Sequence, residues 1–214
     1  LIIFGVVSLI HLYFCYKENE KLRAITKPLC LLMLIIAAII LAPNKPLIYV
    51  GAMLGLIGDI FMLFKHNKIC FALGTFVFLG GHFLYIAQAI LSLSYQINYI
   101  VYIVVPIALV ALAFLIYPLT KKICGILALP GNFYMMILLT GLAFGIMLAI
   151  DNTAKPLPGI LMAIGYASFF VSDTILSITT FAKDVKRRDF YIMLSYLLGE
   201  FLIVFGLLAI TIVA

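Results

Sequence analysis

The 214-residue sequence is 66% hydrophobic and only 10% charged, whereas charged residues make up about a quarter of an ordinary soluble domain. A soluble fold of this size cannot bury so much apolar surface, so the composition indicates a chain whose main solvent is lipid. The formal net charge of +6 lies in short clusters between apolar segments, which predicts attraction to anionic lipid head groups and excludes a nucleic-acid footprint.

Charges and prolines divide the chain into eight apolar segments. We predict membrane spans at residues 1–16, 28–42, 47–64, 70–92, 98–117, 126–150, 159–181 and 190–213. The first segment lacks the basic n-region and cleavage site of a signal peptide, so we interpret it as a span. No connection is long enough for a separate soluble domain. The sequence therefore predicts an all-α fold, a single membrane domain over residues 1–214 that forms a polytopic transmembrane helical bundle of about eight spans.

Lysine and arginine are distributed unequally between the two sides of this topology. Two of them, Lys45 and Lys155, lie in even-numbered connections, and twelve lie in or beside the odd-numbered connections (17–27, 65–69, 118–125, 182–189). Because basic loops stay in the cytoplasm, this bias predicts that both termini face away from it. The short loops and compact length suggest an integral protein of the bacterial inner membrane.

Three acidic residues fall inside predicted spans: Asp59, Asp173 and Glu200. An ionisable group in the hydrocarbon core costs at least ~2.5–3.5 kcal/mol, so one retained there usually serves a pathway or a reaction. The alternative is a protonated acid that forms a structural hydrogen bond between helices. The other acids lie in predicted connections and are interpreted as solvated charges (Glu18, Glu20, Asp151, Asp184 and Asp189).

The depths of these acids suggest one shared cavity. At 1.5 Å per residue, Asp59 lies ~8 Å and Asp173 ~12 Å from the cytoplasmic ends of their spans. Glu200 lies about ten residues into its span from the same side, and His82 sits midway through the fourth span. We predict that all four line a cavity open to the cytoplasm, although the sequence does not establish that the third and seventh spans touch.

The two aspartates also have similar surroundings. Each follows a small residue, in Gly58-Asp59 and Ser172-Asp173, and precedes an apolar turn. The next span then carries another ionisable group, His82 or Glu200. This similarity suggests two parallel repeats of four spans each.

Other polar and small residues have simpler interpretations. Gly51 and Gly55, like Gly141 and Gly145, form GxxxG pairs that indicate close helix packing. His11, alone on the first span, is interpreted as a packing residue or a helix–helix hydrogen-bond partner. The four cysteines show no CxxC spacing and the three histidines are scattered, so no metal site is predicted.

A series of motifs in chain order resembles the lysoplasmalogenase (YhhN-like) family of eight-span membrane proteins, over essentially the whole chain. The final motif departs from the family, which usually has Ala-Gln where this chain has Gly199-Glu200. The matching segments are Thr26-Lys27-Pro28-Leu29, Gly58-Asp59, Gly81-His82-Phe83-Leu84-Tyr85, Tyr134, Ser172-Asp173 with Phe181, and Tyr196-x-x-Gly199-Glu200.

The resemblance implies hydrolysis of the vinyl ether bond of lysoplasmalogen to a fatty aldehyde and glycerophosphoethanolamine or glycerophosphocholine, without a metal or organic cofactor. Vinyl ether cleavage needs an acid that protonates the β-carbon and a carboxylate that stabilises the oxocarbenium ion and activates water. Glycosidases solve a related problem with two carboxylates. We assign these roles to Asp59 and Asp173, without deciding which is the acid. The expected partners are the lysophospholipid substrate and membrane lipids.

Six further residues are candidates for binding substrate or supporting the site. Lys27 is either a phosphate partner or an ordinary positive-inside anchor. Tyr85 and Tyr134 either form hydrogen bonds in the site or belong to the aromatic belt and packing. The other three, whose roles are left open, are His82, Ser172 and Glu200.

Two other functions fit some of the same features. Two-aspartate intramembrane proteases carry Gly-x-Gly-Asp, Tyr-Asp and Pro-Ala-Leu motifs, which this chain does not reproduce around Asp59 and Asp173. A transporter or lipid-sensing protein can use buried acids for proton coupling or ligand binding. Against a transporter, no span is interrupted by Pro-Gly near either aspartate.

Overall fold

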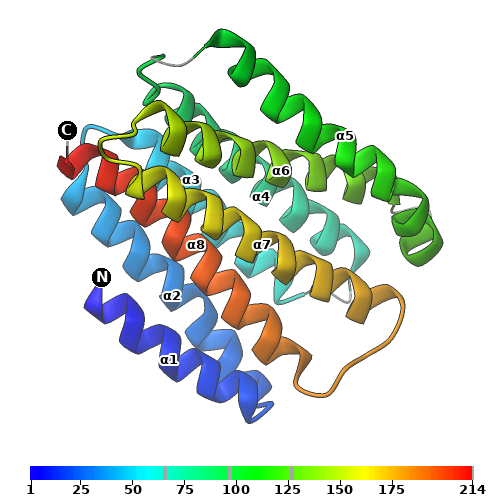
Figure 1. Ribbon diagram of the computed structural model, residues 1–214. Coiled ribbons are helices and arrows are strands. Elements are labelled where there is room, and N and C mark those ends of the chain that lie inside the picture. Colours follow the sequence, from blue (N-terminus) through cyan, green and yellow to red (C-terminus); the bar gives the residue numbers. More distant parts are fainter. Residues whose placement is uncertain (65–66, 96–97, 126–127, 214) are drawn as a thin grey trace.

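The computed structural model describes residues 1–64, 67–95, 98–125 and 128–213. Lys65 and His66, which the sequence places in a connection, lie outside these ranges. Within them the chain is 86% helical with no strand, which confirms the all-α prediction. The helices are α1 (Ile2–Tyr16), α2 (Glu20–Leu41), α3 (Pro46–Met62), α4 (Lys68–Ile90), α5 (Tyr99–Cys124), α6 (Ala128–Asp151), α7 (Leu157–Phe181) and α8 (Arg188–Val213), shown in Figure 1.

Six of these helices are long and apolar enough to cross a membrane, as judged from the described residues. The exceptions are α1 and α3, which are apolar but have only 15 and 17 residues. At 1.5 Å per residue α3 extends about 26 Å, close to the ~30 Å thickness of a bilayer's hydrocarbon core. The architecture is that of a helical membrane bundle.

Two predicted boundaries were wrong because helices continue through prolines. Helix α2 begins at Glu20, eight residues before the predicted span, and contains Pro28. The Asn19 side chain caps its start by accepting the Leu22 N–H at 3.1 Å, which makes a polar first turn possible. Helix α5 likewise runs past Pro118 to Cys124. The extension of α2 places Lys27 on a helix within the bundle and no longer in a loop.

Helix α8 occupies the centre of the bundle and α5 its edge. Helix α8 packs against α1, α2, α3, α4 and α7, whereas α5 packs against α6 and α7. Figure 1 shows α8 running between α2 and α7, with α5 along the upper margin. Helices α3 and α7 have no packing contact in the described part of the chain, and α8 contacts both. The two aspartates are therefore joined through α8.

Glycines allow two helix pairs to approach closely in the same way. A Cβ atom on Gly81 of α4 would lie 2.9 Å from the carbonyl oxygen of Gly51 in α3. A Cβ atom on Gly199 of α8 would lie 2.9 Å from the carbonyl oxygen of Gly165 in α7. Any larger residue at these positions would push the helices apart.

These two crossings occupy equivalent places relative to the ionisable residues. The α3 and α7 glycines lie eight residues before Asp59 and Asp173, and the α4 and α8 glycines immediately precede His82 and Glu200. The α3–α4 and α7–α8 hairpins thus share a crossing and a placement of polar groups. This observation supports the repeat hypothesis for these two hairpins.

The two GxxxG pairs also lie at close contacts. A Cβ on Gly55 would come within 3.0 Å of Leu31, and one on Gly145 would lie 2.6 Å from the backbone nitrogen of Ala163. One on Gly141 would overlap the Tyr166 ring. The prediction of close helix packing is confirmed at both pairs.

Two polar residues outside the predicted cavity can now be placed. His11 Nδ1 is hydrogen-bonded to Thr26 Oγ1 at 2.7 Å, which confirms a helix–helix role. The interpretation of Asp151 as a solvated charge was wrong, because this buried carboxylate accepts hydrogen bonds from the Ser94 N–H at 2.5 Å and from the Tyr102 hydroxyl. Asp151 is the last residue of α6, and its hydrogen bonds join α6 to the chain that follows α4. The position of Asp151 in the sequence does not reveal this tertiary contact.

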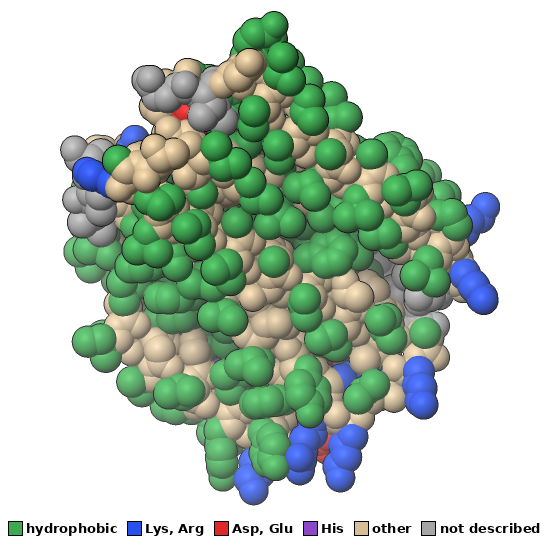
Figure 2. Space-filling view, in the orientation of Figure 1, with side chains coloured by type: hydrophobic (Ala, Val, Ile, Leu, Met, Phe, Trp, Pro, Cys, Tyr) green, Lys and Arg blue, Asp and Glu red, His purple; other side chains and the backbone are tan. Residues whose placement is uncertain are grey.

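Basic side chains gather at one end of the bundle. Figure 2 shows Lys and Arg along the lower and right-hand margins, with few at the upper left. Helix α1 starts and α8 ends on the side opposite this basic end (Figure 1). That the basic end faces the cytoplasm stays a prediction from the positive-inside rule, and a C-terminal reporter that is active only in the cytoplasm would contradict it by giving a signal.

Candidate active site

Asp59 is held by two partners from different helices. The Lys27 ammonium of α2 lies 3.0 Å from Asp59 Oδ1, and the Tyr196 hydroxyl of α8 donates to Asp59 Oδ2 at 3.0 Å. Asp59 is 1% exposed, whereas the Lys27 side chain is 17% exposed. A buried carboxylate needs such compensation, and here α2, α3 and α8 provide it together.

Glu200 lies in the same region, deeper along α8. Its Oε1 accepts a hydrogen bond of 2.5 Å from the Tyr85 hydroxyl of α4. The same oxygen faces Gly55, one turn before Asp59 on α3, and the charges of Glu200 and Asp59 are close enough to interact. The residue at which this chain departs from the family therefore belongs to the cluster.

Tyr134 of α6 connects His82 with Asp173. Its hydroxyl oxygen lies 3.4 Å from His82 Nε2 and interacts with the Asp173 carboxyl of α7. Lys27 is also within electrostatic range of Asp173. Among the described residues, the ion pair of Lys27 is with Asp59.

Aromatic rings enclose His82. The centroid of its ring lies 4.5 Å from that of Phe169, 5.5 Å from Tyr166, 6.0 Å from Tyr134 and 6.1 Å from Tyr85. Aromatic pairs at such spacing pack favourably. The His82 side chain is buried among these rings and is 2% exposed.

Four buried polar atoms of this region have no hydrogen-bond partner in the described structure: Asp59 Oδ1, Asp173 Oδ2, His82 Nδ1 and the Tyr166 hydroxyl. Leaving such an atom unpaired costs about 1–3 kcal/mol. In native proteins such atoms usually mark a place where water or a ligand binds. Asp59 Oδ1 lies 3.0 Å from the Lys27 ammonium, which compensates its charge, whereas the other three atoms lie around Asp173 and His82.

The structure brings together seven of the eight predicted site residues, and the eighth, Ser172, has a different position. Its buried hydroxyl donates to the Ile192 carbonyl of α8 at 3.0 Å, so it joins α7 to α8. The analysis of the sequence did not single out Tyr166 and included Tyr196 only as part of a motif. The chain has twelve tyrosines, and their spacing does not show which of them face the acids.

The donor set does not favour a metal centre. Among the residues that the structure describes, no three His, Cys, Asp or Glu side chains are arranged to hold a metal ion. The carboxyl groups instead face tyrosine hydroxyls and an ammonium group. Such an arrangement suits proton transfer in a site of low polarity.

A family model matches residues 22–207, which includes every residue of this cluster. The chain belongs to the YhhN family. This family includes lysoplasmalogenases, so the chain is a membrane protein of the family in which that activity occurs, as the motif series predicted. No curated protein and no solved structure matches the chain.

Proposed function

We propose that this YhhN-family protein hydrolyses the vinyl ether bond of lysoplasmalogen. The observation that carries the proposal is the difference between the surroundings of the two aspartates. Asp59 is ion-paired and hydrogen-bonded, whereas Asp173 keeps a buried oxygen without a partner. General acid–base catalysis requires such a difference between two carboxyl groups.

The geometry suggests separate roles for the aspartates. The Lys27 ammonium at 3.0 Å favours the ionised form of Asp59. Asp173 has Tyr134 as a hydrogen-bonding neighbour, and its Oδ2 has no hydrogen-bond partner in the described structure. We assign Asp173 as the proton donor and Asp59 as the carboxylate that stabilises positive charge and accepts a proton from water.

The reaction then follows in three steps. The Asp173 carboxyl gives its proton to the β-carbon of the vinyl ether, and the electron pair of the double bond forms the new C–H bond, leaving an oxocarbenium ion. Water adds to the carbon bonded to oxygen and loses a proton to Asp59, which gives a hemiacetal. The hemiacetal then collapses: the carbon–oxygen bond to glycerol breaks as the glycerol oxygen takes the proton held by Asp59, and the hydroxyl proton passes to the Asp173 carboxylate as the aldehyde forms, which restores both carboxyl groups.

Membrane location suits this substrate. A one-chain lipid can place its tail beside apolar helices while its polar head stays at the interface. Lys27, on the second turn of α2 and 17% exposed, lies between the basic end of the bundle and Asp59. The vinyl ether next to the glycerol would then lie at the depth of the aspartates.

The test is aldehyde release by purified protein in detergent. We expect fatty aldehyde from lysoplasmalogen and no hydrolysis of the matching 1-acyl lysophospholipid, whose ester has no carbon–carbon double bond to protonate. Proton-linked uptake of lipid into vesicles without aldehyde formation would instead favour the transporter alternative. Equal turnover of both lipids would contradict carbon protonation and indicate an esterase.

A further inference from the structure

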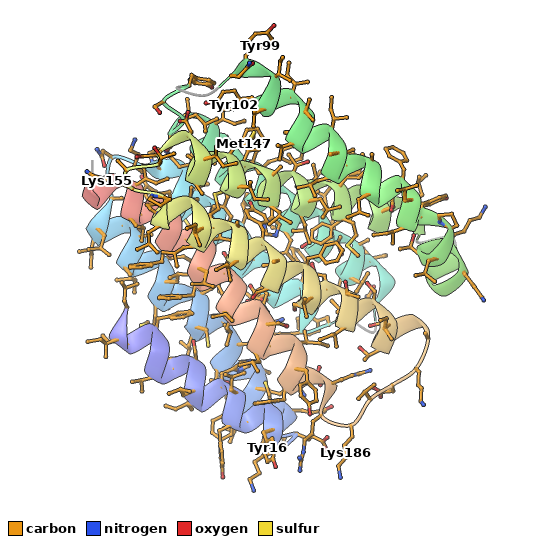
Figure 3. The ribbon with its side chains drawn as sticks, in the orientation of Figure 1. Tyr16, Tyr99, Tyr102, Met147, Lys155 and Lys186 are labelled. Carbon is orange, nitrogen blue, oxygen red and sulfur yellow. The ribbon has the colours of Figure 1, made fainter. Side chains whose placement is uncertain are left out.

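A polar cleft of about 590 Å³ opens at the basic end of the bundle. It lies between the turn that joins α1 to α2 and the connection that joins α7 to α8, and four basic and four acidic side chains line it. Figure 3 labels Tyr16 and Lys186, which lie at this end, opposite Lys155. A basic patch that only attracts anionic lipids needs no such balance of charge.

Two guanidinium groups meet at one carboxylate in this cleft. Arg23 Nη1 lies 2.5 Å from Asp189 Oδ2, and Arg188 Nε lies 4.0 Å from Asp189 Oδ1. These side chains are 20–26% exposed, so ligands can reach them. A guanidinium group has more N–H donors than one carboxylate accepts, and guanidinium groups bind phosphate oxygens with well-defined geometry.

The other acids supply carboxylates around this centre. Asp184 lies 3.2 Å from Arg188 but is 69% exposed, and Glu20 begins α2 on the opposite wall. A ligand with one phosphate and one ammonium group can satisfy both kinds of charge. Glycerophosphoethanolamine and glycerophosphocholine have this composition.

The walls of the cleft are fixed against each other. Glu18 and Arg187 both have positive φ angles, 55° and 60°, a conformation that costs energy in residues other than glycine. The Arg187 N–H donates to Glu18 Oε1 at 3.3 Å, and the Arg187 guanidinium stacks over the Tyr16 ring at 3.9 Å. These two contacts join the α1–α2 turn to the α7–α8 connection.

Two helices lead directly from the cleft to the acid cluster. On α2, Lys27 follows Arg23 by one turn, or about 6 Å along the axis. On α8, Tyr196 follows Asp189 by seven residues, and both Lys27 and Tyr196 contact Asp59. A phosphate at Arg23 would place the first carbon of its glycerol near Lys27 and Asp59.

We propose that this cleft is the headgroup subsite and binds a zwitterionic glycerophospho-base, with its phosphate on Arg23 and Arg188 and its ammonium group at Asp184 and the facing glutamates. The inference rests on the proposed function for the identity of the lipid. A headgroup subsite accounts for the mixed charge of the cleft and for its place at the end of α2 and α8 that leads to Asp59.

Calorimetric titration of the purified full-length protein tests the subsite without turnover. The probes are glycerophosphoethanolamine and glycerol 3-phosphate, which lacks the amine. Arg188→Gln should weaken both about tenfold or more, because charge-assisted hydrogen bonds to phosphate are lost. Asp184→Asn should weaken glycerophosphoethanolamine alone. Lys122→Gln, an exposed residue at the same end but outside the cleft, should leave both unchanged.

A second titration distinguishes a headgroup subsite from a separate site for a soluble phosphodiester. Saturation with micellar 1-acyl lysophosphatidylethanolamine should prevent glycerophosphoethanolamine from binding, whereas simultaneous binding would overturn the subsite. Absence of binding to the wild type, or equal binding by Arg188→Gln, Asp184→Asn and Lys122→Gln, would also overturn it. Because Asp184 is largely exposed, its variant stays informative if Arg188→Gln fails to fold. Aldehyde release without such binding would contradict the subsite and leave the proposed hydrolysis intact. Binding without aldehyde release would contradict the proposed hydrolysis and leave the binding site intact.

Discussion

The α3–α4 and α7–α8 hairpins have similar helix crossings, but the aspartates that they carry have different partners. Each places a glycine against a carbonyl oxygen at the crossing and an aspartate eight residues further on. Asp59 of the first hairpin has an ammonium and a hydroxyl partner. Asp173 of the second keeps Oδ2 buried and unpaired. A shared crossing thus holds one aspartate in an ion pair and the other with an oxygen that has no hydrogen-bond partner in the described structure.

The partners of the two aspartates come from outside their own hairpins. Lys27 belongs to α2, Tyr196 belongs to α8 and Tyr134 belongs to α6. Similar local sequence around the aspartates therefore does not imply similar chemistry. The chemistry depends on which neighbouring helix faces each acid.

The largest expected effect is that of Asp173→Asn. An amide keeps the shape of the side chain but cannot give a proton to carbon, so we expect aldehyde release to fall by about 10²–10⁴-fold or more. Thermal stability in detergent should stay close to wild type, because no ion pair is broken. Near-normal turnover would remove Asp173 from the mechanism and end the distinction between the hairpins.

Asp59→Asn should also abolish turnover, but with a structural consequence that Asp173→Asn lacks. It leaves Lys27 without its counter-charge, and breaking one half of a buried pair costs about 3–5 kcal/mol, a figure to be reduced here because the Lys27 side chain is 17% exposed. The double variant Lys27→Gln/Asp59→Asn should regain thermal stability while remaining inactive. If the single and double variants melt at the same temperature, the ion pair does not stabilise the fold.

A smaller effect is expected from Tyr134→Phe, which removes the hydroxyl between His82 and Asp173. One hydrogen bond contributes about 0.5–1.5 kcal/mol, or up to roughly tenfold in rate. The loss should appear in kcat more than in KM, because the hydroxyl contacts the proposed acid. Tyr49→Phe, at a partly buried core position, is the matched control, and an equal loss in both variants would indicate a packing effect.

The smallest effect is expected from Glu200→Gln, which restores the residue usual in the family. The variant should stay active because the Tyr85 hydroxyl can still donate to the amide oxygen. Removing an ionisable group that interacts with Asp59 should change the pH–rate profile, since coupled acids titrate as a cluster. An inactive variant would make Glu200 a direct participant, and an unchanged profile would show that its charge does not influence the reaction.

Much of the fold was predictable because lipid leaves few options for the backbone. Apolar segments predicted all eight of the described helices, and the rare acids within predicted spans identified Asp59, Asp173 and Glu200, which lie in the candidate site. The start of α2 was missed because Pro28 looked like a boundary, while the Asn19 cap lay in a polar stretch. That error placed Lys27 at a loop and concealed its ion pair with Asp59.

The remaining site contacts depend on which face each helix turns toward its neighbours. Tyr134, Tyr166 and Tyr196 converge from α6, α7 and α8, a meeting that three separate sequence segments do not reveal. Asp151 shows the same limit, because its partner Ser94 lies 57 residues away along the chain. Ser172 is the opposite case. It is next to Asp173 in the sequence and was predicted to belong to the site, but its hydroxyl donates to the backbone of α8.

The central claim is that the carboxyl of Asp173 protonates carbon, and hydrolysis of lysoplasmalogen in D₂O tests it most directly. Carboxyl protons exchange with solvent, so the wild type should release aldehyde with one deuteron on the carbon next to the carbonyl, detected by mass spectrometry after rapid reduction to the alcohol. Authentic aldehyde incubated in D₂O controls for later exchange, and Asp173→Asn should form almost no labelled product. Aldehyde released without deuterium at that carbon, or labelled aldehyde formed at the normal rate by Asp173→Asn, would contradict the account.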